Sequence, residues 1–142
     1  MRALLDVNVL IALLDQAHVH HPRARNWLIQ NIQHGWASCP ITQNGCVRIM
    51  SQPGYPQPVS TAQAIALLRD AAVTPYHQFW ADDFSVLDCD VLDASRVLGP
   101  RQLTDLYLLA LAVRHGGRFV TLDGRIALGA VRGATPQHLV AL

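Results

Sequence analysis

The sequence predicts an α/β fold, with a mostly parallel sheet and helices on both of its faces. Short apolar segments that suit strands alternate along the chain with longer segments that suit helices, which is typical of parallel sheets. The segment 103–115 is apolar on almost all sides, so it predicts a buried central helix. With 142 residues, 51% of them hydrophobic, we expect a single domain spanning residues 1–142 with a sizeable core.

The N-terminal half is predicted to begin with a short buried strand and to continue mainly as helices. The expected elements are a strand over 2–6, a helix over 8–15, a helix over 22–33, a strand over 36–39, and helices over 42–51 and 60–72. Asn8 is the expected N-cap of the first helix, with Asp6 as the alternative, because both side chains can accept a hydrogen bond from the backbone. Thr42 is the expected cap of the third helix for the same reason.

The C-terminal half is predicted to supply the remaining strands and the central helix. The expected elements are a strand over 77–80, the helix over 103–115, a strand over 118–122 and an edge strand over 138–142. The segment 82–98 has no clear pattern and suits two short helical turns. Phe79 and Trp80 are expected to pack in the core, where aromatic side chains contribute most, with base stacking as the alternative.

Charge and cysteine content exclude several classes of protein. All 11 basic residues are arginine and all 10 acidic residues are aspartate, with a formal net charge of +1. The chain is therefore not a strongly basic nucleic-acid binder, so any polyanion must meet a local arginine patch, and carboxylate chemistry must use aspartate. Three cysteines without metal-type spacing fit a reduced, cytoplasmic protein. The apolar N-terminus is interrupted by Asp6 and Asn8, so we expect neither a signal peptide nor a membrane span.

Three aspartates interrupt segments that otherwise suit the core. Asp6 follows the first strand, Asp105 begins the central helix, and Asp123 follows the strand over 118–122. Aspartate is rarely buried unless it is paired or bound to a metal. We expect the three to gather at the carboxyl edge of the sheet, where ligands bind. Two carboxylates about 4 Å apart repel by about 4 kcal/mol at an effective dielectric of ~20, so this cluster needs a divalent cation or shared protons. Taken singly, each also suits a helix cap or a turn.

The sequence around these aspartates is similar to that of a known family. The segments Leu4–Leu10 (LLDVNVL), 103–112 (LTDLYLLALA) and 119–123 (FVTLD) resemble a PIN domain, specifically a VapC-type toxin ribonuclease, and 39–48 extends the resemblance. This resemblance implies a PIN-like, three-layer α/β/α fold with a central, mostly parallel sheet. It also implies a divalent-metal-dependent endoribonuclease, a hydrolase that cuts RNA phosphodiester bonds as the toxin of a type II toxin–antitoxin pair.

The resemblance further implies roles for single residues. The catalytic and metal-binding acids of the family are matched by Asp6, Asp105 and Asp123, with Mg²⁺ or Mn²⁺ as the cofactor. Neighbouring polar positions that support the site are matched by Asn8, Thr104 and Thr121. The implied partners are an RNA substrate (tRNA, rRNA or mRNA), a cognate antitoxin that occludes the pocket, and a second copy of the chain in a homodimer.

One position departs from the family pattern. The family usually has a glutamate on the helix after the second strand, where this chain has Asn44. The Asn44 carbonyl oxygen can still be a metal ligand, but the site loses one negative charge, so weaker metal binding is expected. Two alternatives therefore stay open. One is a catalytically weakened, PIN-derived module for RNA binding or protein interaction. The other is a different metal-dependent phosphoryl hydrolase, which the lack of lysine disfavours.

Two arginines are candidates for binding the substrate phosphate. Arg48 lies one helical turn beyond Asn44, and Arg125 follows Asp123 by two positions. The planar guanidinium group of arginine can hold a phosphate through two parallel hydrogen bonds. The alternative for each is an ordinary solvated surface arginine.

Overall fold

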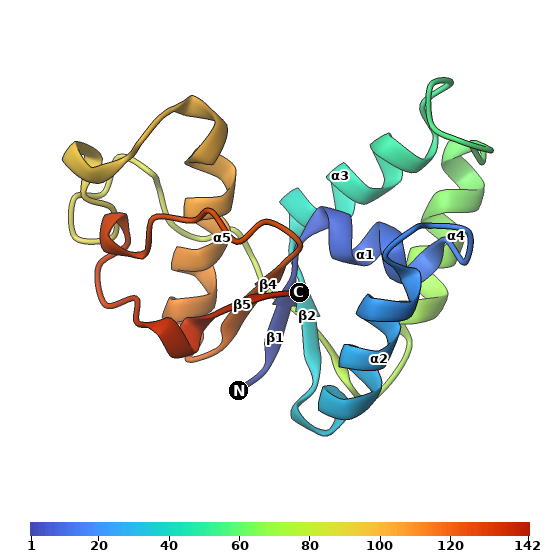
Figure 1. Cartoon of the computed structure of the whole chain (residues 1–142), viewed down its shortest axis with the longest axis horizontal. Helices are drawn as coiled ribbons and strands as arrows, with labels where there is room; N and C mark the ends of the chain where they lie inside the picture. Colours follow the sequence, from blue (N-terminus) through green and yellow to red (C-terminus); the bar gives the residue numbers. More distant parts are fainter.

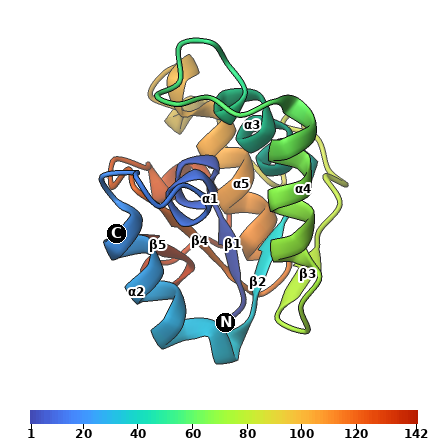
Figure 2. The same ribbon diagram turned by 90° about the vertical axis from the view of Figure 1, so that its right-hand side faces the viewer.

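The fold is a parallel sheet that lies between two helical layers, and the computed structural model describes residues 1–142 (Figures 1 and 2). The strands are β1 (Ala3–Leu5), β2 (Trp36–Ser38), β3 (His77–Phe79), β4 (Arg118–Thr121) and β5 (Leu139–Ala141). The helices are α1 (Val7–Leu14), α2 (His21–Asn31), α3 (Pro40–Met50), α4 (Thr61–Ala72) and α5 (Leu103–Arg114). None of these helices combines the length and the apolar character that crossing a membrane requires.

The order of the strands places β1 at the centre of the sheet. The five strands follow the order β3-β2-β1-β4-β5, and all four neighbouring pairs are parallel. β1 therefore has β2 on one side and β4 on the other, with Leu5 in register with Val120. In open parallel sheets, a crevice forms outside the carboxyl ends of the strands at the point where the strand order reverses. Here that point lies at the ends of β1 and β4.

Each face of the sheet carries its own core. On one face α5 packs against the sheet through fully buried residues such as Leu108, Leu109 and Phe119. The other face is covered by α1, α2, α3 and α4, with Leu5 and Leu10 among the buried residues. Figure 1 shows this division, with α5 on one side of the sheet and the other four helices on the opposite side. The three-layer fold and the buried central helix are thus confirmed.

Two helices have N-caps other than the residues that the sequence predicts. The cap of α1 is Asp6 instead of Asn8, because Asp6 Oδ1 accepts a hydrogen bond from the Val7 amide at 2.7 Å. The cap of α3 is Cys39 instead of Thr42. Thr42 is the third residue of that helix, and its hydroxyl oxygen accepts a hydrogen bond from the Cys39 amide at 3.0 Å. Both Asn8 and Thr42 lie just inside the helix that they were expected to start.

The segment around β3 differs from the prediction in one respect. Trp80 is buried, as predicted, but Phe79 is 54% exposed, so its assignment to the core is wrong. β3 is an edge strand that is covered less completely than the strands at the centre of the sheet. The segment 82–98 that follows contains one short 3₁₀ turn, Ala94–Arg96, where two helical turns were expected.

Candidate active site

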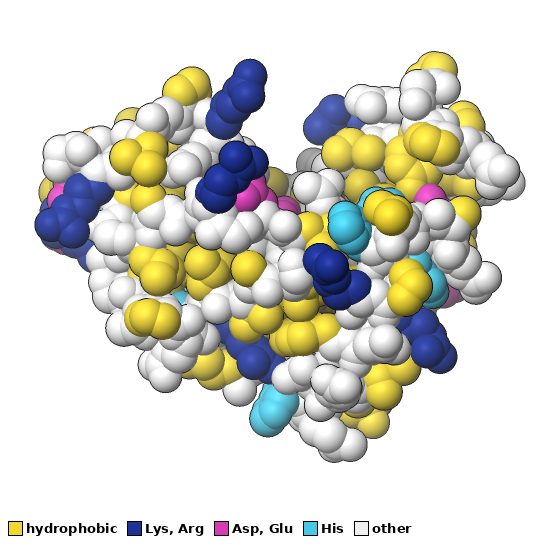
Figure 3. All heavy atoms as spheres, in the orientation of Figure 1, with side chains coloured by type: hydrophobic (Ala, Val, Ile, Leu, Met, Phe, Trp, Pro, Cys, Tyr) yellow, Lys and Arg dark blue, Asp and Glu magenta, His cyan; other side chains and the backbone are white.

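Two of the predicted acidic residues lie at the carboxyl ends of adjacent strands. Asp6 directly follows β1 and Asp123 comes two residues after β4. The pairing of these strands continues past β1, because the Asp6 amide donates a hydrogen bond to the Val120 carbonyl oxygen at 2.9 Å. Figure 3 shows a notch at the top of the molecule, with acidic side chains near its floor and basic side chains on both rims. The parallel sheet thus brings two acids to the edge that the sequence predicted.

Asp6 is buried and both of its carboxylate oxygens accept hydrogen bonds. Oδ1 accepts from the Val7 amide and Oδ2 accepts from the Thr121 hydroxyl, each at 2.7 Å. Burial raises the pKa of Asp6, the two hydrogen bonds lower it, and the nearby charge of Asp123 raises it, with a net upward shift. The helix-cap interpretation of Asp6 is confirmed. Asp6 is also held against β4 by Thr121 and lies within reach of the charge of Asp123.

Asp123 lies in a turn that Thr121 and Arg125 fix on either side. The Asp123 amide donates a hydrogen bond to Thr121 Oγ1 at 3.1 Å. Its Oδ1 accepts a hydrogen bond from the Arg125 amide at 2.9 Å and lies 3.5 Å from Arg125 Nε. The turn interpretation is therefore confirmed as well. Because the Asp123 side chain is 48% exposed, its second oxygen remains free to meet a ligand from solution.

Asp105 lies in the first turn of α5 and its side chain accepts no hydrogen bond from the protein. Burial raises the pKa of Asp105 to about 6, and the charges of Asp6 and Asp123 add to this shift. Neither Asp105 nor Thr104 caps the helix, because Gln102 occupies the cap position and no side chain makes a cap hydrogen bond there. The three aspartates are therefore close enough for their charges to interact.

The donor set of this site suits a hard divalent cation. Three carboxylates repel one another, the chain has no lysine, and Arg125, which pairs with Asp123, is 92% exposed. The ligand oxygens of the three aspartates do not all lie within 4.8 Å of one another. Ligand oxygens lie about 2.0–2.1 Å from Mg²⁺, so this spread means that at least one of the three carboxylates would reach the ion through one of its bound waters. The residues present could therefore hold a divalent cation with water in the remaining positions.

Of the other predicted residues, only Thr121 and Arg125 form hydrogen bonds with the three aspartates. Asn8 and Thr104 are exposed in the first turns of α1 and α5. Asn44 and Arg48 are exposed on α3. Helix α3 packs closely against the start of α1, because a Cβ atom at Gly45 would lie only 2.7 Å from Val7 Cγ2. The absence of a side chain at Gly45 thus lets the turn that carries Asn44 lie against the start of α1.

Two polar side chains make contacts that were not predicted from the sequence. Asp82 Oδ2 accepts a hydrogen bond from the Ile41 amide, at the start of α3, at 3.2 Å. Gln102 Nε2 donates a hydrogen bond to the Arg125 carbonyl oxygen at 3.0 Å. Each contact joins segments that are distant along the chain, so no local pattern of residues could reveal it.

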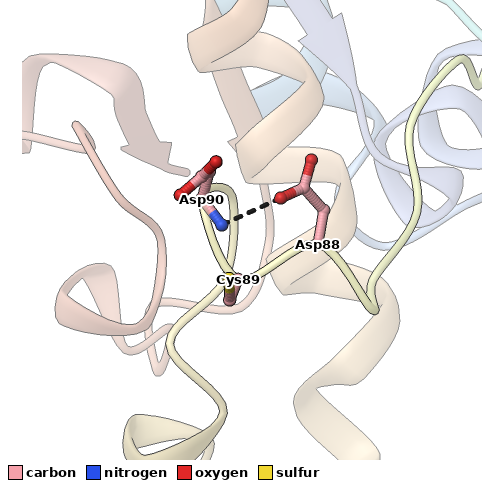
Figure 4. A group of neighbouring side chains, drawn as sticks. All are labelled: Asp88, Cys89 and Asp90. Carbon is pink, nitrogen blue, oxygen red and sulfur yellow. Dashed lines mark hydrogen bonds between the residues drawn. The ribbon is translucent and has the colours of Figure 1, made fainter.

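A second acidic group consists of consecutive residues and has a local explanation. Ligand atoms of Asp88, Cys89 and Asp90 all lie within 4.8 Å of one another, and the three residues are exposed (Figure 4). The Asp90 amide donates a hydrogen bond to Asp88 Oδ1 at 2.9 Å, which closes an ordinary turn. The turn alone brings these side chains together, so their proximity gives no reason to place an ion there.

Comparison with known proteins identifies the family of this chain and agrees with its fold. The PIN domain family matches residues 3–131. The chain is 63% identical to Ribonuclease VapC44 of Mycobacterium tuberculosis over 142 residues, which is 100% of both chains. It is 47% identical to Ribonuclease VapC39 of the same species over 135 residues, which is 94% of this chain and 96% of the relative.

A solved structure shares the fold at much lower sequence identity. The crystal structure of VapBC2 from Rickettsia felis, bound to a DNA fragment from their promoter, matches with a TM-score of 0.56 and 12% identity. The match covers 87% of this chain and 89% of the other. This structural match supports the three-layer architecture, whereas the sequence relatives support the assignment to the VapC-type ribonucleases. The chain therefore belongs to the PIN-domain family and is a ribonuclease of the VapC type.

Proposed function

We propose that this VapC-type ribonuclease toxin hydrolyses RNA phosphodiester bonds with a divalent cation, Mg²⁺ or Mn²⁺, that is bound by Asp6, Asp105 and Asp123. The proposal rests on the proximity of these three carboxylates, whose charges interact. Two of them follow adjacent parallel strands, and the charges of both add to the rise that burial causes in the pKa of the third, Asp105. When bound, the cation would neutralise this charge, activate water and stabilise the charge that develops on the phosphoryl oxygens.

The three aspartates differ in their hydrogen bonds, so we propose different roles for them. Asp6 is held rigidly by Val7 and Thr121, and Asp123 is held by its turn, so both are suited to fixing the position of the cation. Asp105 has no hydrogen-bond partner in the protein. We therefore propose Asp105 as the carboxylate that takes a proton from the attacking water.

Two arginine side chains would bind the phosphate of the substrate. Arg125 is almost fully exposed and lies against Asp123, so its guanidinium group is at the edge of the acidic cluster. Arg48 is exposed on α3, one turn after Asn44. Because the formal net charge is only +1, these local arginines would supply most of the attraction for RNA. A pairwise hydrogen bond from arginine to phosphate is the interaction that we propose.

The first experiment is metal removal from the purified protein. Total cellular RNA incubated with Mg²⁺ or Mn²⁺ is expected to be cut at a limited set of sites, leaving 5′-phosphate and 3′-hydroxyl ends, and EDTA is expected to abolish the cutting. Cutting that persists in EDTA would contradict the metal-dependent mechanism. If protein free of copurified antitoxin cuts nothing with either metal, the chain is instead a catalytically weakened RNA-binding module. The exposed, neutral Asn44 is the feature that favours this second candidate.

Replacing Asn44 by glutamate is expected to increase cleavage at limiting Mg²⁺. The substitution restores one negative charge on α3, beside the start of α1, where Gly45 packs against Val7. An added carboxylate near a hard cation strengthens its binding, so we expect about a tenfold lower Mg²⁺ concentration at half-maximal rate. The rate at saturating Mg²⁺ should change much less. The measurement is the rate of cleavage as a function of Mg²⁺ concentration.

The matched control for Asn44→Glu is Gln30→Glu, on the exposed face of α2. It adds one negative charge at an exposed position on another helix. A shift of the Mg²⁺ dependence in Asn44→Glu alone supports a metal site that is weakened at Asn44. An equal response of the two variants, or a loss of activity in Asn44→Glu, would refute that explanation.

The partners that we propose are an RNA (tRNA, rRNA or mRNA), a cognate antitoxin and a second copy of the chain, all in the cytoplasm. A cavity of about 440 Å³ between α1, α2 and α4 offers apolar surface to a protein partner. Its lining includes Leu10, Leu28, Trp36 and Leu68. Apolar cavities of this kind accept hydrophobic side chains from a partner protein. Coexpression with any small gene that lies next to its own would test for an antitoxin that copurifies.

A further inference from the structure

One side chain joins the two segments that carry Asp105 and Asp123. Gln102 ends the 3₁₀ turn Pro100–Gln102 and precedes α5 directly. Its side chain does not cap that helix. Instead, Gln102 Nε2 donates a hydrogen bond to the backbone carbonyl oxygen of Arg125 at 3.0 Å, across 23 positions of the chain. The start of the helix that carries Asp105 is thereby tied to the loop after β4.

The loop on the other side of this hydrogen bond is tied in turn to the acidic cluster. The Arg125 amide donates to Asp123 Oδ1 at 2.9 Å, and the Asp123 amide donates to Thr121 Oγ1 at 3.1 Å. Thr121 donates its hydroxyl hydrogen to Asp6 Oδ2. A continuous series of hydrogen bonds thus runs from Gln102 through the loop to Asp6. Residues 122–127 lie outside regular helix and strand, so side-chain contacts of this kind determine where the loop lies.

The second polar atom of the Gln102 side chain distinguishes a positioning role from a stabilising one. Gln102 Oε1 is buried and has no hydrogen-bond partner in the protein. A buried carbonyl oxygen without a partner reduces stability, so the amide as a whole is a poor choice if stability is its only role. Methionine, which has a similar shape and no polar atoms, would remove this unpaired oxygen. It would also remove the hydrogen bond to Arg125.

We infer that Gln102 is a positioning residue, which sets the separation between Asp105 and Asp123 by holding the loop 122–127 against the start of α5. This inference rests on the proposed metal-dependent function, for which the relative positions of the two carboxylates decide the affinity for the cation. Residues that orient metal ligands through hydrogen bonds commonly change metal affinity by about 10–100-fold when they are replaced. Gln102 acts through the backbone of Arg125 and does not itself need to contact the cation or the RNA.

The test compares Gln102→Met with the wild-type protein, using Mn²⁺ alone as the probe. The Mn²⁺ dissociation constant, measured by calorimetry, is expected to rise about tenfold. Amide hydrogen exchange in the metal-free protein is expected to become faster in residues 122–127. The thermal midpoint is expected to stay the same or rise, because the buried, unpaired oxygen is gone. Gln137→Met is the matched control, since Gln137 is exposed and its side chain makes no hydrogen bond.

The two readouts separate this inference from the proposed function. Unchanged exchange in residues 122–127 overturns the inference, and so does an unchanged Mn²⁺ affinity in a protein whose wild type binds Mn²⁺. A wild-type chain that binds no Mn²⁺ refutes the metal-dependent function. In that case, faster exchange in Gln102→Met still supports the role of Gln102 in holding the loop, and equal exchange rejects it.

Discussion

Asp105→Asn is expected to lower RNA cleavage by about 100-fold or more, since the proposed general base and one charge of the proposed cation site are both lost. Asparagine has the same shape as aspartate but cannot accept the proton from water and carries no charge. Asp105 makes no hydrogen bond within the protein, so the substitution breaks no hydrogen bond. The rate of cleavage at saturating Mn²⁺ measures the effect. The same variant should also lose most of the thermal stabilisation that Mn²⁺ gives to the wild-type protein.

In the metal-free protein the same substitution is expected to increase stability. The pKa of Asp105 is raised to about 6 by burial and by two neighbouring carboxylates, from a usual value of 3.8. Between about pH 4 and pH 6 the folded chain therefore binds more protons than the unfolded chain, and wild-type stability falls as the pH rises. The asparagine side chain of the variant does not titrate. At pH 7 we expect a gain of about 1–2 kcal/mol in the free energy of unfolding, allowing for partial solvent screening.

A matched control separates these effects from a general effect of charge removal. Asp70 is exposed on α4, so Asp70→Asn should leave cleavage unchanged and stability within about 0.5 kcal/mol of the wild type. Urea unfolding at about pH 4.5 and pH 7, on either side of the raised pKa, gives the stability of each variant. An Asp105→Asn protein that still cuts RNA at the wild-type rate would exclude Asp105 from the mechanism. A metal-free variant less stable than the wild type at pH 7 would show that the carboxylate is not in the repulsive environment described above.

Much of the fold follows from local sequence patterns, because parallel sheets have simple requirements. Apolar strands at 2–6 and 118–122 must be buried on both faces, and their polar successors must emerge at the same edge. Asp6 and Asp123 were therefore predicted to share an edge without knowledge of the strand order. The buried helix α5 was equally evident, because its apolar side chains surround the helix axis.

Other features depend on contacts that the sequence does not display. Asp6 and Asn8 are both good caps, and only the hydrogen bond to Val7 decides between them. Phe79 suits a core strand by its chemistry, but the edge position of β3 leaves it exposed. The hydrogen bond from Gln102 to Arg125 joins two loops whose proximity results from the packing of α5 against β4. Local propensity gives way to tertiary context at each of these residues.

Thr121→Val is expected to destabilise the protein and to weaken metal binding, because one buried hydroxyl serves two of the three acids. Thr121 is fully buried at the end of β4. Its Oγ1 donates a hydrogen bond to Asp6 Oδ2 at 2.7 Å and accepts one from the Asp123 amide at 3.1 Å. Valine leaves both partners unsatisfied, one of them a charged oxygen. The expected loss is about 2–3 kcal/mol in the free energy of unfolding, measured by urea denaturation.

The matched variant for this prediction is Thr121→Ser, which keeps the hydroxyl and removes one buried methyl group. Its expected cost is about 1 kcal/mol in the free energy of unfolding, with cleavage near the wild-type level. In Thr121→Val, cleavage at limiting Mn²⁺ should fall about tenfold and recover in part at high Mn²⁺, because Asp6 is less firmly held. Equal cleavage by the two folded variants would show that Asp6 and Asp123 keep their positions without Thr121. Reduced cleavage in Thr121→Val but not in Thr121→Ser would show that this hydroxyl aligns the carboxylates at the ends of β1 and β4.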